Sequence, residues 1–364
     1  MKNTFGNSIS LTIFGESHGK SIGAVIDGIA PGIKIDAEHI NKKLMQRQAF
    51  GKISTARHEA DAFEIVSGEF NGYTTGTPLT IIIQNTSTSS KDYTQFVDTP
   101  RPSHADYTAE LKYHGFQDYR GGGHFSGRLT AALVAAGAIL DSALRSKGIY
   151  IGTHISRLAG SSDRDFADFG ADINKLSEKR FPVLSDEASA EMVAKIEKAA
   201  KEGDSVGGIL ETAVIGLPGG VGEPFFDSVE SVVSHALFSV PGIKGVSFGE
   251  GFGFADLYGS EANDAFRTDG KSVYTETNRN GGVNGGISNG MPLIIKSAVK
   301  PTPSIYKEQM SVSLSRLENE TLKIEGRHDP AIIHRARAAV DAAVAIAIAD
   351  LLTTRYGTDY LSNK

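Results

Sequence analysis

The sequence contains no cysteine and no tryptophan among its 364 residues. Without cysteine the chain has no disulfide framework, no thiolate metal site and no cysteine nucleophile, so nothing indicates an oxidising compartment. Residues 1–6 also lack the apolar segment of a secretion signal. We therefore expect a cytoplasmic protein.

Long hydrophobic runs and an excess of basic residues are missing as well. The most apolar stretch, Ala338–Leu352, is interrupted by Asp341 and Asp350 and is too short to cross a bilayer. The chain carries 37 Lys and Arg against 43 Asp and Glu, a net charge of −6. A general nucleic-acid binder is basic, so this class is disfavoured. An anionic ligand would need a local group of cationic side chains.

Short apolar segments and a few long helical ones alternate irregularly along the chain. We expect strands at Ser8–Phe14, Ile22–Ile26, Phe63–Val66, Leu79–Ile83, Tyr150–Ser156, Ile209–Ile215, Gly245–Gly249 and Leu293–Val299. We expect helices from Asp36 to Gln46, from Ser185 to Lys201 and over Val229–Phe238. Without strict βαβ alternation this order favours an α+β fold. No internal repeat and no linker is evident, so we expect one domain over residues 1–364.

A glycine-rich loop, Arg120–Arg128, precedes a small-residue apolar segment. Its three consecutive glycines permit positive φ angles and close approach of a ligand to the backbone. Ser126 stands at the N-cap of a helix that should end near Lys147, with Gly148 as its stop. A loop that leads into a helix N-terminus presents free N–H groups and a positive dipole, which suits an anion. The alternative is a surface turn before a core helix.

Two histidines lie in loops that a ligand could reach. His18 follows a predicted strand within Gly15–Gly19, and His104 stands at the start of a short helix that should reach Tyr113. Imidazole is the natural general acid or base near neutral pH. Each has a structural alternative: His18 hydrogen-bonds backbone, and the spacing of Ser103–Asp106 is that of a capping box.

Arg47, Lys52 and Arg57 are spaced along a polar, irregular stretch. They either face solvent or together bind an anion. A cluster of basic residues stands out in a chain with a negative net charge, which favours the anion-binding interpretation.

Asp329 precedes Pro330 and the last helix, so we expect an N-cap followed by proline at the first helical position. Arg327 beside it would hold the carboxylate ionised or bind a phosphate. Arg335 and Arg337 are expected to be ordinary solvated or paired charges.

Other site types are excluded or not indicated. Gly249–Gly253 matches a dinucleotide fingerprint only in its glycines, because no helix follows it. No group of His, Asp and Glu has metal-ligand spacing, so no metal site is predicted. A nucleophile elbow of the Gly-x-Ser-x-Gly type is absent from the sequence.

Taken together, these motifs resemble the chorismate synthase family over nearly the whole chain. Gly15–Gly28, Gly123–Arg128 with Gly137–Ile139, and Arg327–Ala331 resemble the three signatures of the family. Shorter family-like blocks lie between them, namely Ser67-Gly68, Thr75–Pro78, Arg101–Asp106, Gly259–Glu261, Gly285–Gly290 and Val299–Ile305.

The resemblance implies a fold in which antiparallel sheets flank a helical layer. It also implies a lyase reaction, the 1,4-elimination of phosphate and a ring proton from 5-enolpyruvylshikimate 3-phosphate. The product is chorismate, and the step is the last of the shikimate pathway. The family requires reduced FMN although the overall reaction is redox-neutral, and it usually forms homotetramers. Some members reduce the flavin with NAD(P)H themselves; with no added reductase domain, this chain is expected to depend on an external reductant.

The resemblance also assigns site residues. His18, His104 and Asp329 match the catalytic residues: the acid for the leaving phosphate, the histidine that protonates the flavin, and the carboxylate that works with the flavin to remove the ring proton. The matching substrate-binding residues are Ser17, Arg47, Lys52, Arg57 and Arg128. The matching cofactor-binding residues are His124, Phe125, Ser126, Pro241, Gly242, Gly285, Lys300, Pro301, Thr302, Pro303, Ser304 and Arg327.

The chain departs from the family pattern at a few positions. Gln46 and Gln48-Ala49-Phe50 stand where many members have consecutive arginines and a Pro-Gly pair. Lys52 replaces a frequent arginine, whose bidentate fork lysine lacks. His124-Phe125 replaces a common Arg-Ser pair, so contacts there should be mainly backbone.

Two other functions fit the same motifs: a flavin-dependent oxidoreductase that consumes NAD(P)H stoichiometrically, and a catalytically silent protein that binds flavin or anions.

Overall fold

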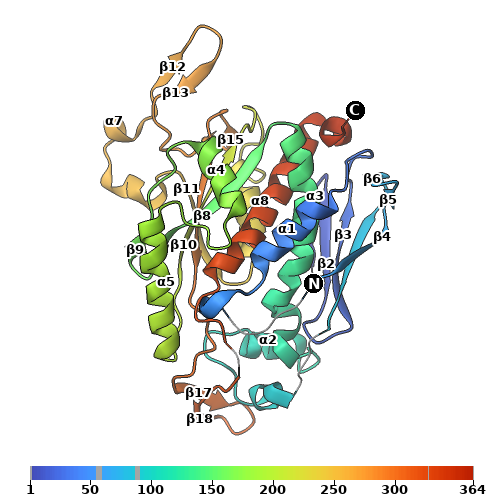
Figure 1. Cartoon of the computed structure of the whole chain (residues 1–364), viewed down its shortest axis with the longest axis vertical. Coiled ribbons are helices and arrows are strands. Elements are labelled where there is room, and N and C mark those ends of the chain that lie inside the picture. Colours follow the sequence, from blue (N-terminus) through green and yellow to red (C-terminus); the bar gives the residue numbers. More distant parts are fainter. Residues whose placement is uncertain (1, 55–59, 87–90, 327, 364) are drawn as a thin grey trace.

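Two antiparallel sheets enclose a layer of helices in the computed structural model, which describes residues 2–54, 60–86, 91–326 and 328–363 (Figure 1). The first sheet has the order β1-β2-β3-β7-β4, with β1 Thr4–Phe5, β2 Ser10–Gly15, β3 Ser21–Asp27, β7 Leu79–Gln84 and β4 Phe63–Ser67. The second has the order β11-β16-β10-β8-β9, with β11 Ile243–Phe248, β16 Leu293–Val299, β10 Gly208–Ile215, β8 Tyr150–Leu158 and β9 Ser161–Ser162. The expected α+β sandwich is confirmed.

Alternating apolar residues explain how each sheet faces the helices. In β2, Leu11 pairs with Ile26 of β3, and both side chains are buried. In β16, Leu293, Ile295 and Val299 alternate with more exposed residues. A period of two places every second side chain on the same face, so each sheet has one apolar face turned toward the core.

The helical layer consists mainly of α1 Ala37–Arg47, α3 Thr130–Ser146 and α8 Ile333–Tyr356. In Figure 1, α3 and α8 run side by side through the centre of the molecule. Helix α3 packs on β3 and β7, and α8 packs on β8 and β10, so the two helices join the sheets. A Cβ atom added at Gly137 would lie 2.4 Å from Cβ of Ala342, so the closest approach of α3 and α8 requires glycine there.

The remaining elements lie around this frame. The other helices are α2 Asp106–Tyr113, α4 Phe169–Glu178, α5 Asp186–Lys201, α6 Val229–Phe238 and α7 Gly259–Ala262. Small hairpins are formed by β5 Glu69–Phe70 with β6 Tyr73–Thr74, β12 Phe266–Thr268 with β13 Val273–Thr275, β14 Val283–Asn284 with β15 Ile287–Ser288, and β17 Gln309–Ser313 with β18 Glu318–Leu322. The sequence analysis did not foresee α4 or these hairpins.

Helix boundaries confirm some expected caps and correct others. Asp36 and Ser126 each accept a backbone N–H at a helix start, as expected, and Ser185 does the same before α5. The predicted capping box at residues 103–106 is wrong, because α2 begins at Asp106 after Ala105, which makes no side-chain cap. The predicted N-cap at Asp329 is also wrong, because Ile332 precedes the first residue of α8.

Among the described residues, one helical segment, Gly127–Ser146, is long and apolar enough to cross a membrane. Within its apolar window 78% of the residues are buried inside the protein, so here it is a core helix that covers both sheets.

Candidate active site

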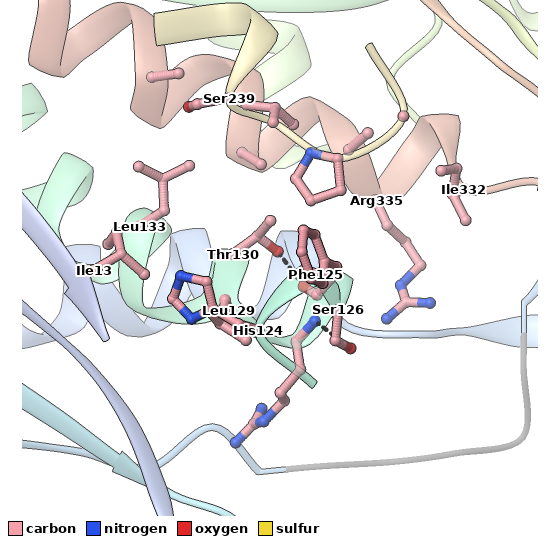
Figure 2. Close-up of a pocket in the computed structure, with 18 of the residues that line it drawn as sticks. Ile13, His124, Phe125, Ser126, Leu129, Thr130, Leu133, Ser239, Ile332 and Arg335 are labelled. Carbon is pink, nitrogen blue, oxygen red and sulfur yellow. Dashed lines mark hydrogen bonds between the residues drawn. The ribbon is translucent and has the colours of Figure 1, made fainter. Parts of the chain in front are cut away.

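A cavity of about 810 Å³ opens where the N-terminal ends of α3 and α8 meet several loops. Its floor is the glycine-rich loop, and its walls include residues 103–105, 239–242, 300–301 and 303. Figure 2 shows Phe125 and Ser126 on one side and Ile332 and Arg335 of the α8 end on the other. Volumes of 300–1,000 Å³ are typical of sites for small molecules and cofactors.

The glycine-rich loop forms the 3₁₀ turns η3 Arg120–Phe125 and η4 Gly127–Leu129. Gly121, Gly122 and Gly123 have φ of 60°, 81° and 52°, which only glycine adopts readily. The ring of His124 is fixed by its Nδ1 atom, 2.8 Å from the carbonyl oxygen of Gly15. The loop therefore places the side chains of residues 124–126 against the cavity through backbone geometry.

His18 lies behind this loop, 7% exposed, and is not itself part of the cavity wall. A Cβ atom added at Gly121 would lie 2.2 Å from Cε1 of the His18 ring. The neighbouring Ser17 donates its backbone N–H to the carbonyl of Gly123 at 3.0 Å. The loop and the first histidine therefore form one packed unit.

Gly121→Ala should lower turnover about tenfold. The new methyl group would displace the His18 ring, and alanine at positive φ costs roughly 1–2 kcal/mol. Steady-state kinetics beside a thermal unfolding curve would measure both effects. Gly72→Ala is the control, because Gly72 also has positive φ, 80°, but nothing lies within 4 Å of the added Cβ. Equal turnover in the two variants would contradict the proposed coupling of Gly121 to His18.

His104 lies in the cavity wall with its Nδ1 atom 2.6 Å from Oδ1 of Asp106. Arg101 donates two hydrogen bonds of 2.8 Å to the same carboxylate. Although burial raises the pKa of Asp106, these bonds from Arg101 and His104 hold it well below its ordinary value. Arg101 Nη2 lies 3.1 Å from the same Nδ1 atom, but the shorter contact with the carboxylate favours the His104 tautomer that carries its proton on Nδ1 and leaves Nε2 to exchange protons.

Burial lowers the pKa of His104 below 6.5, and the positive charges of Arg101 and Lys300 lower it further. The hydrogen bond to Asp106 raises the pKa but does not outweigh these effects. The neutral imidazole is therefore the dominant form at pH 7.

Arg47 and Arg128 meet at a buried carboxylate. Asp61 accepts a hydrogen bond of 2.9 Å from Nη1 of Arg47 through Oδ2 and one from Nη1 of Arg128 through Oδ1. Arg47 also donates to the hydroxyl of Thr130, and Arg128 to the amide oxygen of Asn85. All three charged groups line the cavity, and together they carry one net positive charge.

Asp329 lies in the wall beside Arg335, whose Nη1 atom is 2.7 Å from its Oδ2. Lys300, in the opposite loop, donates to the carbonyl oxygen of Ser103 next to His104. Burial lowers the pKa of Lys300, with a smaller contribution from Lys244. The cavity thus combines an imidazole, a carboxylate and several cations.

The structure places the remaining predicted site residues as follows. Pro241, Gly242, Pro301 and Pro303 line the same cavity as the residues above. The residues that do not line it are Ser17, His18, Lys52, Gly285, Thr302 and Ser304. Gly285 forms the turn of the β14–β15 hairpin, and Lys52 lies exposed in the 3₁₀ turn Gly51–Ile53. Arg57 and Arg327 fall outside the described residues.

Asp61, Thr130 and Arg335 line the cavity but were not among the predicted site residues. For Asp61 the available signal was physical: two arginines predicted to converge on one site need a counter-charge when they are buried. Arg335 was expected to be an ordinary charge. No signal in the sequence singled out Thr130.

Comparison with known proteins agrees with this architecture. The family model of chorismate synthase matches residues 9–353. A chorismate synthase of Thermococcus kodakarensis is 44% identical over 351 residues, which cover 96% of this chain and 97% of that protein. One of Chitinophaga pinensis is 46% identical over 350 residues, 96% of each chain. A crystal structure of chorismate synthase superposes with a TM-score of 0.76 at 26% identity, covering 98% of this chain and 94% of the other.

An α+β sandwich with a cation-lined cavity, a half-buried imidazole and a carboxylate defines an enzyme that acts on a small anionic molecule. With the matches over nearly its full length, the chain belongs to the chorismate synthase family. It is a lyase that converts 5-enolpyruvylshikimate 3-phosphate to chorismate in the shikimate pathway of aromatic amino acid biosynthesis. The family uses reduced FMN.

Proposed function

We propose that the 810 Å³ cavity is where this chain carries out the 1,4-elimination. The observation that supports the proposal is the convergence of His104, Asp329, Arg47 and Arg128 on one cavity from distant parts of the chain. The substrate carries a phosphate and two carboxylates, so it needs cations that are held in place before it binds. The same convergence supports the proposal that residues 1–364 form a single functional domain.

We propose that the same cavity also holds the flavin. A flavin ring needs flat apolar contacts, and Phe125, Leu133, Pro241 and Ile332 provide them in the wall. Its phosphate needs donors, which Ser126 and Lys300 offer at the floor and the opposite loop. A Cβ atom at Gly127 would meet nothing within 4 Å, so the backbone there is open to a ligand. We infer that residues 124–127, 241–242 and 300–304 hold reduced FMN, with Gly285 and Arg327 among the cofactor contacts. When bound, the flavin supplies the electron-transfer chemistry that side chains lack.

The side chains then have distinct tasks. Arg47 and Arg128, with Lys52, Arg57 and Ser17, bind the anionic groups of the substrate and offset the charge that develops on the departing phosphate. His18 donates a proton to that phosphate, and Asp329 takes part in removing the ring proton. His104 holds a proton at Nδ1 toward Asp106 and exchanges protons with the cofactor side of the cavity through Nε2.

Three further properties belong to the proposal. The enzyme relies on an external reductant for its flavin, it assembles as a homotetramer, and it acts in the cytoplasm. The support for these three properties is the family resemblance, which extends over 96% of this chain.

One assay separates the proposed function from its two alternatives. Pre-reduced FMN is supplied anaerobically with 5-enolpyruvylshikimate 3-phosphate, and chorismate is followed over time. Many turnovers for each flavin support the elimination. One product for each reductant would instead identify an NAD(P)H-consuming oxidoreductase, and flavin binding without product would identify a silent binding protein.

A further inference from the structure

Arg335 joins two parts of the cavity wall that are nearly 300 residues apart in sequence. Its Nη1 atom donates to Oδ2 of Asp329 at 2.7 Å, and its Nε atom donates to the backbone oxygen of Arg47 at 2.9 Å. The side chains of Arg335 and Asp329 are 21% and 16% exposed, so the pair is partly shielded from water. In Figure 2 the Arg335 side chain extends from α8 toward the floor of the cavity.

The position of Arg335 is unfavourable for the helix that carries it. It lies in the first turn of α8, which begins at Ile333 and has no acidic residue in that turn. The positive end of a helix dipole disfavours a cation there. Arg47 is the last residue of α1, so its carbonyl lies at the negative end of that helix. The guanidinium is therefore stabilised by α1 and Asp329 rather than by its own helix.

Asp329 in turn has no capping role, because the residue before α8 is Ile332 and makes no side-chain cap. Its carboxylate lines the cavity and accepts a hydrogen bond from Arg335. A rigid planar fork with donors at Nε and Nη1 can fix both partners at once, whereas a lysine ammonium is a point charge on a flexible stem. A carboxylate that acts on a carbon-bound proton must be held in one orientation.

We propose that Arg335 is the positioning residue of Asp329: it holds the carboxylate toward the reacting ring by tying it to the end of α1. This inference rests on the proposed role of Asp329. It adds a residue to the site and links the proton-removing group to the backbone of Arg47, whose side chain is proposed to bind the substrate.

The test uses the full-length enzyme with reduced FMN and substrate labelled with deuterium at the ring position that loses its proton. R335Q should lower kcat about 10²-fold, the loss expected for a misplaced catalytic group, and change KM far less. R335K keeps the positive charge but loses the two-point contact, so its kcat should be about tenfold lower than that of the wild type. Because proton removal then limits turnover, both variants should show a primary isotope effect on kcat of at least about twofold.

Arg180 provides a matched control. It donates to the backbone oxygens of Gln48 and Ala49 just beyond α1, each at 3.3 Å, and does not line the cavity. R180Q should therefore keep kcat and its isotope effect at the wild-type values, even if the melting temperature falls.

Two outcomes would overturn the inference, and D329N separates them. If D329N is impaired while R335Q and R335K keep near-normal kcat or show no isotope effect, Arg335 does not position the carboxylate. If D329N itself keeps near-normal kcat, the proposed role of Asp329 fails, and the inference fails with it.

Discussion

His104→Ala is expected to lower kcat by about 10²- to 10⁴-fold, the range in which a positioned proton donor or acceptor contributes. The affinity for substrate should change far less, because the cations Arg47 and Arg128 remain in the wall. The structural reason is the fixed orientation of the ring, with Nδ1 held 2.6 Å from Asp106 and Nε2 left for exchange. Substrate binding measured without flavin, beside kcat with reduced FMN, would give both quantities.

The pH dependence provides a second measure of the same residue. Because burial lowers the pKa of His104, the ring is neutral above that pKa and gains a proton only as the pH falls further below 6.5. The kcat of the wild type should therefore change with pH below pH 6.5, where His104 gains its proton. This pH dependence should be absent in His104→Ala. Asp106→Asn removes the carboxylate that fixes the ring of His104. This variant should also have a lower kcat than the wild type, but the loss should be smaller than in His104→Ala. A His104→Ala enzyme with wild-type kcat would exclude the proposed role.

Local signals in the sequence sufficed for the frame of the site. Glycines that need positive φ, the Ser126 cap and the small-residue helix after it predicted the floor of the cavity and the start of α3. The period of two predicted the main strands of both sheets to within a few residues. These features depend on neighbours in sequence, so a single chain is enough to find them.

Features set by charge pairing were not predictable in the same way. Asp106 and Asp329 both stand where a cap is expected, yet each carboxylate bonds to an arginine five or six residues away. A cap contributes about 1 kcal/mol, whereas charge-assisted hydrogen bonds are roughly twice as strong as neutral ones, so the ion pair prevails. Asp61 joins Arg47 and Arg128 only after α1 and the glycine-rich loop have packed together. Its role therefore depends on the fold, which the sequence around it does not reveal.

Asp141 of α3 should be among the residues most important for stability, because it is the centre of a buried charge network in the helical layer. Its Oδ2 atom lies 2.7 Å from Nε2 of His39, 2.9 Å from Nε of Arg145 and 3.6 Å from Nζ of Lys43. Lys43 also lies 3.5 Å from Asp341 of α8, so the network joins α1, α3 and α8. The Asp141 side chain is 5% exposed and that of Lys43 10%, so water cannot replace a lost partner.

Asp141→Asn is expected to lower the free energy of unfolding at pH 7 by about 3–5 kcal/mol, because it removes the buried carboxylate that pairs with both Lys43 and Arg145. Although burial raises the pKa of Asp141, Lys43 and the hydrogen bond from His39 hold it well below 3.8. A carboxylate with a depressed folded-state pKa stabilises the protein above its unfolded pKa, and that stability is lost as the pH falls toward the folded value. Urea titrations should therefore show the full difference from wild type above about pH 5 and a shrinking difference below about pH 4.

Asp186→Asn is the control, since Asp186 is 87% exposed in its pair with Lys179 and an exposed pair contributes about 0–1 kcal/mol. Similar losses in the two variants, or a difference that persists unchanged at low pH, would show that the network does not hold the three helices together.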